Sequence, residues 1–265
     1  MRKKIPPYSS LAYRLSRNIE SSAVWLKLYK WFCFAFLKPG NVNQTPIFIN
    51  NRNHYTYLKD LIDWLDKNGF TNYYVIDNDS TYPPLLEFYQ AKLPERVIYL
   101  NKNAGHLSFW KENIIARVKN SFYIYTDSDV LPVLESNPSF LSSLYKTLKS
   151  HPQTLKVGPA IKIDDLPDYY ALKKDVINHE EQFWNDPIAE NLYKAPIDTT
   201  MALYLPNYYW IHPLWDNIRV SGDCLVRHQP WYQHSEQLTD EQKYYQSMAV
   251  TQTHWTVLHN EQESA

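Results

Sequence analysis

The chain has 265 residues, with 27 Lys and Arg against 28 Asp and Glu, and this balance lacks the basic excess typical of nucleic-acid-binding proteins. Its two cysteines, Cys33 and Cys224, exclude a disulfide scaffold and a four-cysteine zinc site. Its five glycines are too widely spaced for the phosphate-binding loops G-x-G-x-x-G and G-x-x-x-x-G-K-[ST].

Residues 1–44 are predicted to form a basic, aromatic helical extension. They hold eight basic residues against one acidic residue, Glu20. The apolar run over 23–37 is interrupted by Lys27 and Lys30 and is shorter than the ~20 residues of a bilayer-spanning helix. We therefore expect no transmembrane helix, and the run is not followed by the cleavage site of a signal peptide. The helix is expected to pack on the domain; the other interpretation is a helix lying on an anionic membrane surface.

From Thr45 onward, short apolar runs alternate with helical stretches. Four runs of β-branched and aromatic residues predict buried strands, over 46–50, 73–77, 96–100 and 122–126. Helical crossovers are predicted between them, over 57–66, 85–90 and 107–118. This alternation predicts an α/β fold with a mostly parallel central sheet and helices on both faces.

The second half of the chain is less regular and rich in proline and aromatic residues. It predicts strands over 155–161, 200–205 and 218–221 and helices over 169–184 and 240–248. We expect one domain over 45–258, followed by a frayed polar tail over 259–265.

Polar residues follow each of the first four predicted strands. In an open α/β sheet, ligands bind beyond the carboxyl ends of the strands, where these loops converge. The loops that we expect to meet there are 50–53, 77–81, 101–105 and 127–129.

Two of these loops contain an Asp-x-Asp pair, Asp77/Asp79 and Asp127/Asp129. The string alone has little weight, because turns favour Asp and Asn and such pairs arise by chance. The position of Asp127 and Asp129 is more specific, since they directly follow a strand that should be buried. Two carboxylates at such a strand end suit a hard divalent cation, Mg²⁺ or Mn²⁺.

Taken in order, four motifs resemble the nucleotide-sugar domain of GT-A glycosyltransferases, closest to the bacterial family 2-like group: 46–53, 75–81, 103–105 and 122–129. Residues 219–232 look like the closing segment of that group, in which a histidine completes the metal site. The resemblance covers roughly residues 45–232. It implies the Rossmann-like GT-A form of the α/β fold, with a nucleotide-binding half over 45–135 and an acceptor-side half over 136–258.

The resemblance also implies which residues meet the donor nucleotide. Asp77 matches the acidic residue that contacts uridine, and Asn50 or Arg52 matches the loop beneath the base. Asn103 and Gly105 form the third motif of the donor-binding series.

For the metal, the resemblance implies Asp127, Asp129 and His228. Asp127 matches the first aspartate of the metal motif, turned to ribose or to metal-bound water, and Asp129 matches the direct ligand. His228 matches the late histidine ligand, although an isolated histidine is more often a surface or hydrogen-bonded residue. Because histidine is less typical for Mg²⁺, Mn²⁺ is preferred. Arg227 or Arg219 is a candidate second positive partner of the diphosphate, and the other interpretation of either is a solvated surface charge.

Glycosyl transfer with inversion also requires a base for the acceptor hydroxyl. Asp198, just before a predicted strand, is the first choice and Glu181 the second. Asp198 can equally be a turn residue, and glutamates such as Glu181 are routine on solvated helix faces. The acceptor-loop aspartate pair of many family 2 enzymes is not recognisable in this sequence.

The resemblance, with these residues at the matching positions, implies a metal-dependent, inverting glycosyltransferase of the hexosyltransferase type. It would move a sugar from a nucleoside diphosphate sugar, with UDP as the expected nucleotide, to a glycan or lipid-linked saccharide acceptor in polysaccharide biosynthesis. No nucleic-acid partner is expected. The absence of an export signal predicts a cytoplasmic protein, with peripheral contact at the inner membrane face through residues 1–38 as the second interpretation.

Three alternatives stay open at this point. One is an inactive nucleotide- or glycan-binding module on the same scaffold. Another is a sugar-1-phosphate nucleotidyltransferase, which would carry a glycine-rich basic loop where Asn50–Asn53 stand. The third is an aspartyl-phosphate phosphatase, which would carry Thr or Val at the position of Leu131.

Overall fold

The computed structural model describes residues 23–118, 120–198, 200–207 and 217–248. The predicted tail over 259–265 and residues 1–22 of the predicted N-terminal extension lie outside these residues.

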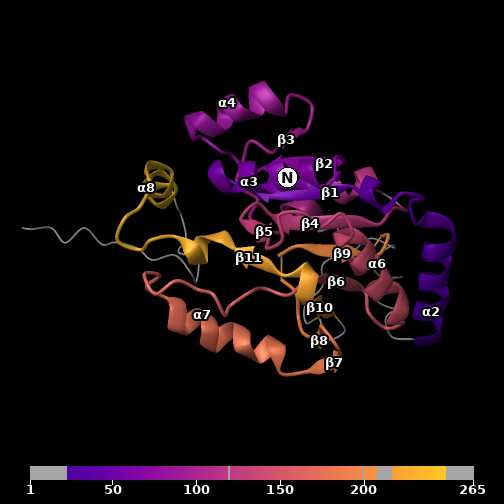
Figure 1. Cartoon of the computed structure of the whole chain (residues 1–265). Helices are drawn as coiled ribbons and strands as arrows, with labels where there is room; N and C mark the ends of the chain where they lie inside the picture. The colour runs from indigo at the N-terminus through magenta and orange to yellow at the C-terminus, as the bar shows by residue number, and fades with distance from the viewer. Residues whose placement is uncertain (1–22, 119, 199, 208–216, 249–265) are drawn as a thin grey trace, which may run out of the picture.

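A nine-stranded mixed sheet forms the centre of the molecule, in the order β3-β2-β1-β4-β9-β6-β10-β8-β7 (Figure 1). Its strands are β1 (Ile47–Asn51), β2 (Tyr73–Asp77), β3 (Val97–Tyr99), β4 (Tyr123–Asp127), β6 (Lys156–Pro159), β7 (Pro187–Ala189), β8 (Leu192–Lys194), β9 (Ala202–Tyr204) and β10 (Ile218–Val220). The pairings give β8 and β9 the opposite direction to the other seven strands. The predicted α/β class with a mostly parallel sheet is therefore confirmed.

The described helices are α2 (Ala23–Phe32), α3 (Thr56–Lys67), α4 (Pro83–Lys92), α5 (Ser108–Lys111), α6 (Phe140–Ser150), α7 (Lys173–Glu180) and α8 (Asp240–Ser247). Two proline residues occupy the first turn of α4, where a missing N–H costs nothing. The helix predicted over 107–118 is divided into α5 and a 3₁₀ segment, Ile114–Val118. The helix predicted over 169–184 is shortened to α7 and a 3₁₀ turn, Glu181–Trp184.

On one face of the sheet, α5 packs its aromatic side chains against the central strands. The ring of Phe109 lies 4.7 Å from that of Phe48, 5.0 Å from Tyr123 and 5.5 Å from Tyr125, measured between centroids. All four rings are fully buried. This contact explains why the four-residue helix is strongly aromatic.

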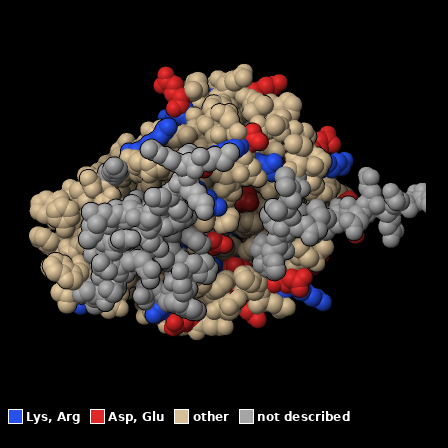
Figure 2. Space-filling model, turned by 180° about the vertical axis from the view of Figure 1, so that it is seen from behind, with Lys and Arg blue, Asp and Glu red and all other residues tan. Residues whose placement is uncertain are grey.

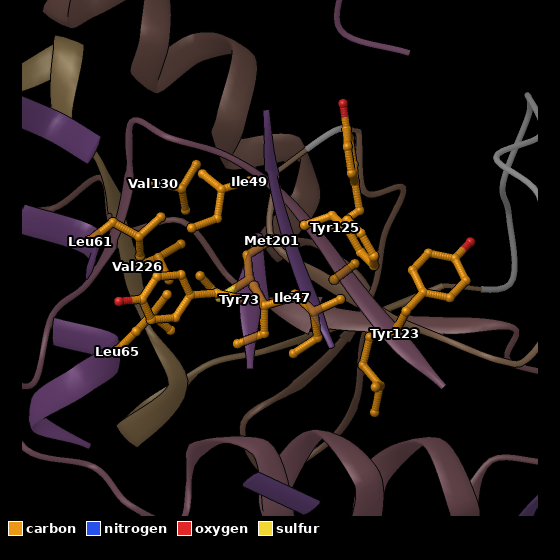
Figure 3. Packing of buried hydrophobic residues seen from close by; sticks show 14 of the residues in the cluster. Ile47, Ile49, Leu61, Leu65, Tyr73, Tyr123, Tyr125, Val130, Met201 and Val226 are labelled. Atoms are coloured by element: carbon orange, nitrogen blue, oxygen red, sulfur yellow. The ribbon is translucent and has the colours of Figure 1, made fainter. Parts of the chain in front are cut away.

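The other face is covered by α3 and α6. Leu61 and Leu65 of α3 are buried in the same cluster as Val130 and Val226, and Figure 3 shows them pointing toward it. This stripe of α3 is the one that its helical periodicity predicts. The sheet therefore has helices on both faces, as expected.

A second, two-stranded sheet was not predicted. It pairs β5 (Val130–Pro132) with β11 (Val226–His228) in antiparallel register, so that His228 lies opposite Val130. The backbone N–H of Gln229 donates to the carbonyl of Asp129 at 2.8 Å and extends the ladder by one step. This pairing joins the end of β4 to a segment nearly one hundred residues further along the chain.

The helix α2 packs along the amino ends of the parallel strands, at the opposite end of the molecule from α8 (Figure 1). The ammonium group of Lys30 is buried and donates to the carbonyls of His151 at 2.6 Å and Thr154 at 2.7 Å. Phe34, in the π-helical turn that follows, packs its ring 5.0 Å from that of Phe122. The described part of the extension, residues 23–44, is thus attached to the domain by both polar and aromatic contacts.

Within the described residues, no helix is both long enough and apolar enough to cross a membrane.

Candidate functional site

The carboxyl ends of β1, β2 and β4 lie side by side at one edge of the sheet. The register pairs Asn50 with Asp127 and Asn51 with Asp77. Three of the four predicted loops therefore start from neighbouring positions, as the parallel topology requires.

Asn50 joins these loops through its side-chain amide. Its Nδ2 donates to Oδ1 of Asp127 at 3.2 Å. Its Oδ1 accepts from the amide of Asn78 and, at 2.9 Å, from the hydroxyl of Ser108. The Oδ1 of Asn78 in turn accepts from the backbone N–H of Ala104 at 3.0 Å. Asn50 therefore fixes the orientation of the Asp127 carboxylate relative to its neighbours.

The structure gives Asp77 an internal role. Its side chain is only 3% exposed. Its Oδ1 accepts from the hydroxyl of Tyr89 at 3.1 Å, and its Oδ2 accepts from the backbone N–H of Ser80 at 3.1 Å. Both carboxylate oxygens thus hold the loop after β2 in shape. The exposed carboxylate of this loop belongs to Asp79, which adopts a positive φ of 66°.

Asp129 and His228 lie next to each other. The Nε2 atom of His228 is 3.4 Å from Oδ2 of Asp129, and both side chains are less than one-fifth exposed. The β5–β11 ladder causes this proximity, because Asp129 directly precedes β5 and His228 ends β11. Asp127 points instead toward Asn50.

The two residues carry polar atoms that suit a ligand. Oδ1 of Asp129 and Nδ1 of His228 are buried atoms for which the described part of the chain provides no hydrogen-bond partner. Such atoms are costly unless they are paired. Among the residues described, no group of three or more His, Cys, Asp or Glu side chains is arranged to hold a metal ion. A carboxylate and an imidazole still fit a Mn²⁺ or Mg²⁺ that takes its remaining ligands from water and from substrate phosphates.

Aromatic side chains lie near this pair, and sequence reasoning missed them. The ring of His54 stacks on that of Tyr245 at 4.2 Å and lies 5.2 Å from that of Tyr57. Burial lowers the pKa of His54, and the carboxylates of Asp129 and Glu241 oppose that shift. Burial also raises the pKa of Tyr245, and Asp129 adds to this effect. The available signal for His54 was its position in the polar loop after the first predicted strand.

Arg227 is engaged within the protein. Its guanidinium donates to Oδ2 of Asp165, and the hydroxyl of Tyr232 donates to Oδ1 of the same carboxylate at 2.5 Å. A diphosphate that recruited Arg227 would have to compete with this ion pair.

The two candidate bases, Asp198 and Glu181, are both exposed but have different neighbours. Burial, followed by the carboxylates of Asp127 and Asp198, raises the pKa of Tyr125. Asp198 and Asp127 thus both act electrostatically on Tyr125. Glu181 begins a 3₁₀ turn, and the residue before it, Glu180, forms a buried ion pair.

Buried cations hold the segment that carries Asp198. The ammonium group of Lys156 donates to the carbonyls of Ile197 at 2.5 Å and Asp198 at 3.4 Å. The guanidinium of Arg219 donates to the carbonyl of Pro196 at 2.9 Å. The segment is therefore positioned through its backbone, which leaves the carboxylate of Asp198 exposed.

The remaining predicted donor-binding residues lie around the same edge. Arg52 is half-buried and donates through Nη2 to the carbonyl of Met248 at 3.3 Å. Asn103 accepts from the backbone N–H of Gly105 at 3.0 Å, and Gly105 has a φ of 76°, which glycine adopts without strain. The surface seen from behind is hollowed near its centre, and acidic side chains lie in and around the hollow (Figure 2).

Comparisons with known proteins give a partial likeness of fold. No protein-family model and no curated protein sequence matches this chain. Among solved structures, it is similar to glucosyl-3-phosphoglycerate synthase from Mycobacterium tuberculosis in complex with phosphoglyceric acid, with a TM-score of 0.39 and 13% identity. The match covers 69% of this chain and 61% of that enzyme, and it concerns the fold alone.

Proposed function

We propose that the protein is a metal-dependent, inverting glycosyltransferase. It would take a sugar from a nucleoside diphosphate sugar, with UDP as the expected nucleotide, and transfer it to a glycan or lipid-linked saccharide. The observation that carries this proposal is the contact between Asp129 and His228, with one unpartnered buried atom on each, at the carboxyl edge of a mostly parallel sheet.

Each residue of the pair has a distinct task in this proposal. Asp129 would hold Mn²⁺ or Mg²⁺ through its carboxylate and His228 through its imidazole. When bound, the cation supplies positive charge that stabilises the departing diphosphate. Asp127, whose orientation Asn50 fixes, would face the ribose or a metal-bound water.

The neighbouring loops would bind the nucleotide. Arg52 and the polar residues after β1 adjoin His54, whose ring stacks on Tyr245, and these two rings would offer apolar surface beside the candidate cation site. Asp77 would contribute indirectly, because its carboxylate shapes the loop on which Asp79 is exposed. Asn103 and Gly105 would close the donor site from the third loop.

Asp198 is our choice for the base that accepts the proton of the acceptor hydroxyl. It is exposed, and Lys156 holds its backbone. The carboxylates of Asp198 and Asp127 both raise the pKa of Tyr125, and this shared effect favours Asp198 over Glu181. The task requires a carboxylate within hydrogen-bond reach of the acceptor.

The test is release of nucleoside diphosphate from a panel of nucleotide sugars, with and without Mn²⁺. We expect slow Mn²⁺-dependent hydrolysis of a UDP-sugar in the absence of acceptor, lowered at least about 100-fold in Asp129→Ala. Asp164→Ala is the matched control, because Asp164 is an exposed aspartate whose contact is with Lys162.

Two outcomes would contradict the proposal. Donor binding without Mn²⁺-stimulated hydrolysis or transfer, over the whole panel, would favour a binding module. Hydrolysis that survives in Asp129→Ala would place the reaction elsewhere. The thermal midpoint of Asp129→Ala, measured beside that of the wild type, separates loss of the site from loss of the fold.

A further inference from the structure

The outward side of α2 and of the turn after it is an exposed apolar surface. Its large side chains are between 46% and 67% exposed: Val24, Trp25, Leu28, Trp31, Phe32 and Phe36. We call these six residues the aromatic face. In Figure 2, which views the molecule from behind, the edge formed by α2 lies on the left and is mostly free of charged side chains.

The opposite side of the same helix is fastened to the domain. Leu26 and Cys33 are buried, and Lys30 donates to two backbone carbonyls of the segment after α6. The hydroxyl of Tyr29 donates to the carbonyl of Pro206 after β9. Because these contacts fix the rotation of α2, the aromatic face cannot turn into the core.

Among the described residues, the segments that carry and support the aromatic face are basic. Residues 23–38, which carry the face, and 140–154, which hold α6 and the two carbonyls that Lys30 contacts, contain no Asp or Glu. Lys27 and Lys38 are exposed on the segment that carries the face, and Lys146 and Lys149 are exposed on the neighbouring helix α6. The surroundings are therefore complementary to an anionic partner.

We infer that the aromatic face docks on the surface of an anionic lipid bilayer. Tryptophan and phenylalanine side chains favour the boundary between headgroups and acyl chains, while lysines beside them attract anionic headgroups. This combination of exposed Trp and Phe with Lys, on a helix too short to span the bilayer, is typical of a helix that lies in the interface plane.

The position of the face has a consequence for the candidate site. The contacts of α2 lie before β6 and after β9, which is the amino edge of the parallel strands. Asp129 and His228 lie at the carboxyl edge. A docked molecule would therefore keep its candidate site turned away from the lipid, and docking does not depend on the proposed function.

The test is co-sedimentation of the full chain with vesicles of phosphatidylcholine alone or mixed with phosphatidylglycerol. We expect the vesicle-bound fraction to need the anionic lipid and to fall as salt rises. In the variant Trp25→Ser/Trp31→Ser/Phe36→Ser the partition coefficient should fall at least about tenfold. Lys27→Glu/Lys38→Glu should weaken binding to the anionic vesicles in the same direction.

The matched control is Tyr169→Ser/Ile188→Ser, which removes two exposed apolar side chains from another part of the surface. It should bind vesicles as the wild type does. No binding to anionic vesicles, or an equal loss in the control, would overturn the inference. A stable dimer in light scattering that disappears in the triple variant, without vesicle binding, would assign the face to a second copy instead. Unchanged thermal midpoints would show that the variants fold.

Discussion

At the scale of single residues, the environment of the two ring nitrogens of His228 favours a metal ligand over an ordinary hydrogen-bonded histidine. Its Nδ1 is buried without a partner in the described structure, and its Nε2 faces Asp129. If it holds a cation, His228→Ala should weaken Mn²⁺ binding by about tenfold or more, a loss typical of disturbed metal shells. Electron paramagnetic resonance of free Mn²⁺ measures this directly.

The control for that change is His234→Ala. His234 lies on the same segment, and its ring stacks on that of Tyr169. It should bind Mn²⁺ like the wild type. Equal Mn²⁺ affinity in the wild type, His228→Ala and His234→Ala would remove His228 from the candidate metal site.

The lowered pKa of Lys156 predicts how the free energy of unfolding depends on pH. Burial lowers its pKa from 10.5 to about 7, an effect that Asp198 opposes and Arg219 reinforces. Between these two values the unfolded chain binds more protons than the native one, so the free energy of unfolding should rise as pH increases from 7 to 9. Lys156→Met should make that rise shallower, as measured by urea unfolding at several pH values.

The exposed Lys92 supplies the comparison. Lys92→Met should keep the wild-type pH dependence. A residual rise is expected in Lys156→Met, because burial also lowers the pKa of Lys30 to about 7. Parallel curves for the wild type and Lys156→Met would show that Lys156 keeps its proton in the native state.

Among the elements, α7 is held to β10 by a buried ion pair. Nη1 of Arg219 donates to Oε2 of Glu180 at 2.7 Å, and both side chains are 6% exposed. Removing one partner leaves a buried charge, so Glu180→Ala should lower the free energy of unfolding by about 3–5 kcal/mol. Chemical denaturation measures the loss.

Two further variants sharpen this prediction. Glu181→Ala removes the exposed neighbouring carboxylate and should change stability by less than about 0.5 kcal/mol. The double variant Glu180→Leu/Arg219→Met should recover part of the loss, because no charge stays unpaired. A loss in Glu180→Ala no larger than that in Glu181→Ala would count against a buried pair.

The helix α8 supplies a cap for α3. Tyr55, at the start of α3, makes no side-chain capping bond, and the carboxylate of Glu241 accepts from the backbone N–H groups of Tyr55 at 2.7 Å and Thr56 at 3.1 Å. Its other oxygen accepts from the hydroxyl of Thr56 at 2.6 Å. Because a carboxylate also complements the positive end of a helix, Glu241→Ala should cost about 1–2 kcal/mol in thermal or urea unfolding.

Glu236→Ala is the control for the cap, since Glu236 is an exposed glutamate on the segment before α8. It should leave stability within about 0.5 kcal/mol of the wild type. Equal effects of the two substitutions would mean that the contact between α8 and α3 adds nothing to stability.

For the whole molecule, the strands that build the centre of the sheet could be predicted because their pattern is local. The runs over β1, β2 and β4 are buried on both faces, so β-branched and aromatic residues mark them. The hairpin of β7 and β8 could not be predicted in this way, since its three-residue strands are exposed or half-buried and have no apolar run. The three-residue ladder of β5 and β11 likewise depends on long-range pairing.

The candidate site could likewise be predicted only where it depends on local sequence pattern and topology. Topology places Asp127, and Asp129 just beyond it, at the edge where parallel strands end, and this could be inferred from the chain. The hydrogen-bond partners of single side chains could not be inferred. Asp77 accepts from Tyr89 and Ser80, and Arg227 donates to Asp165, through contacts that no sequence spacing reveals.

The central claim is that Asp129 and His228 together hold a cation that binds a nucleoside diphosphate. Calorimetric titration with UDP tests it in three samples: wild type with Mn²⁺, wild type with chelator, and Asp129→Asn with Mn²⁺. We predict binding in the first and an affinity at least about tenfold lower in the other two. Equal affinity in all three, or no binding of UDP to the folded wild type with Mn²⁺, would contradict the claim.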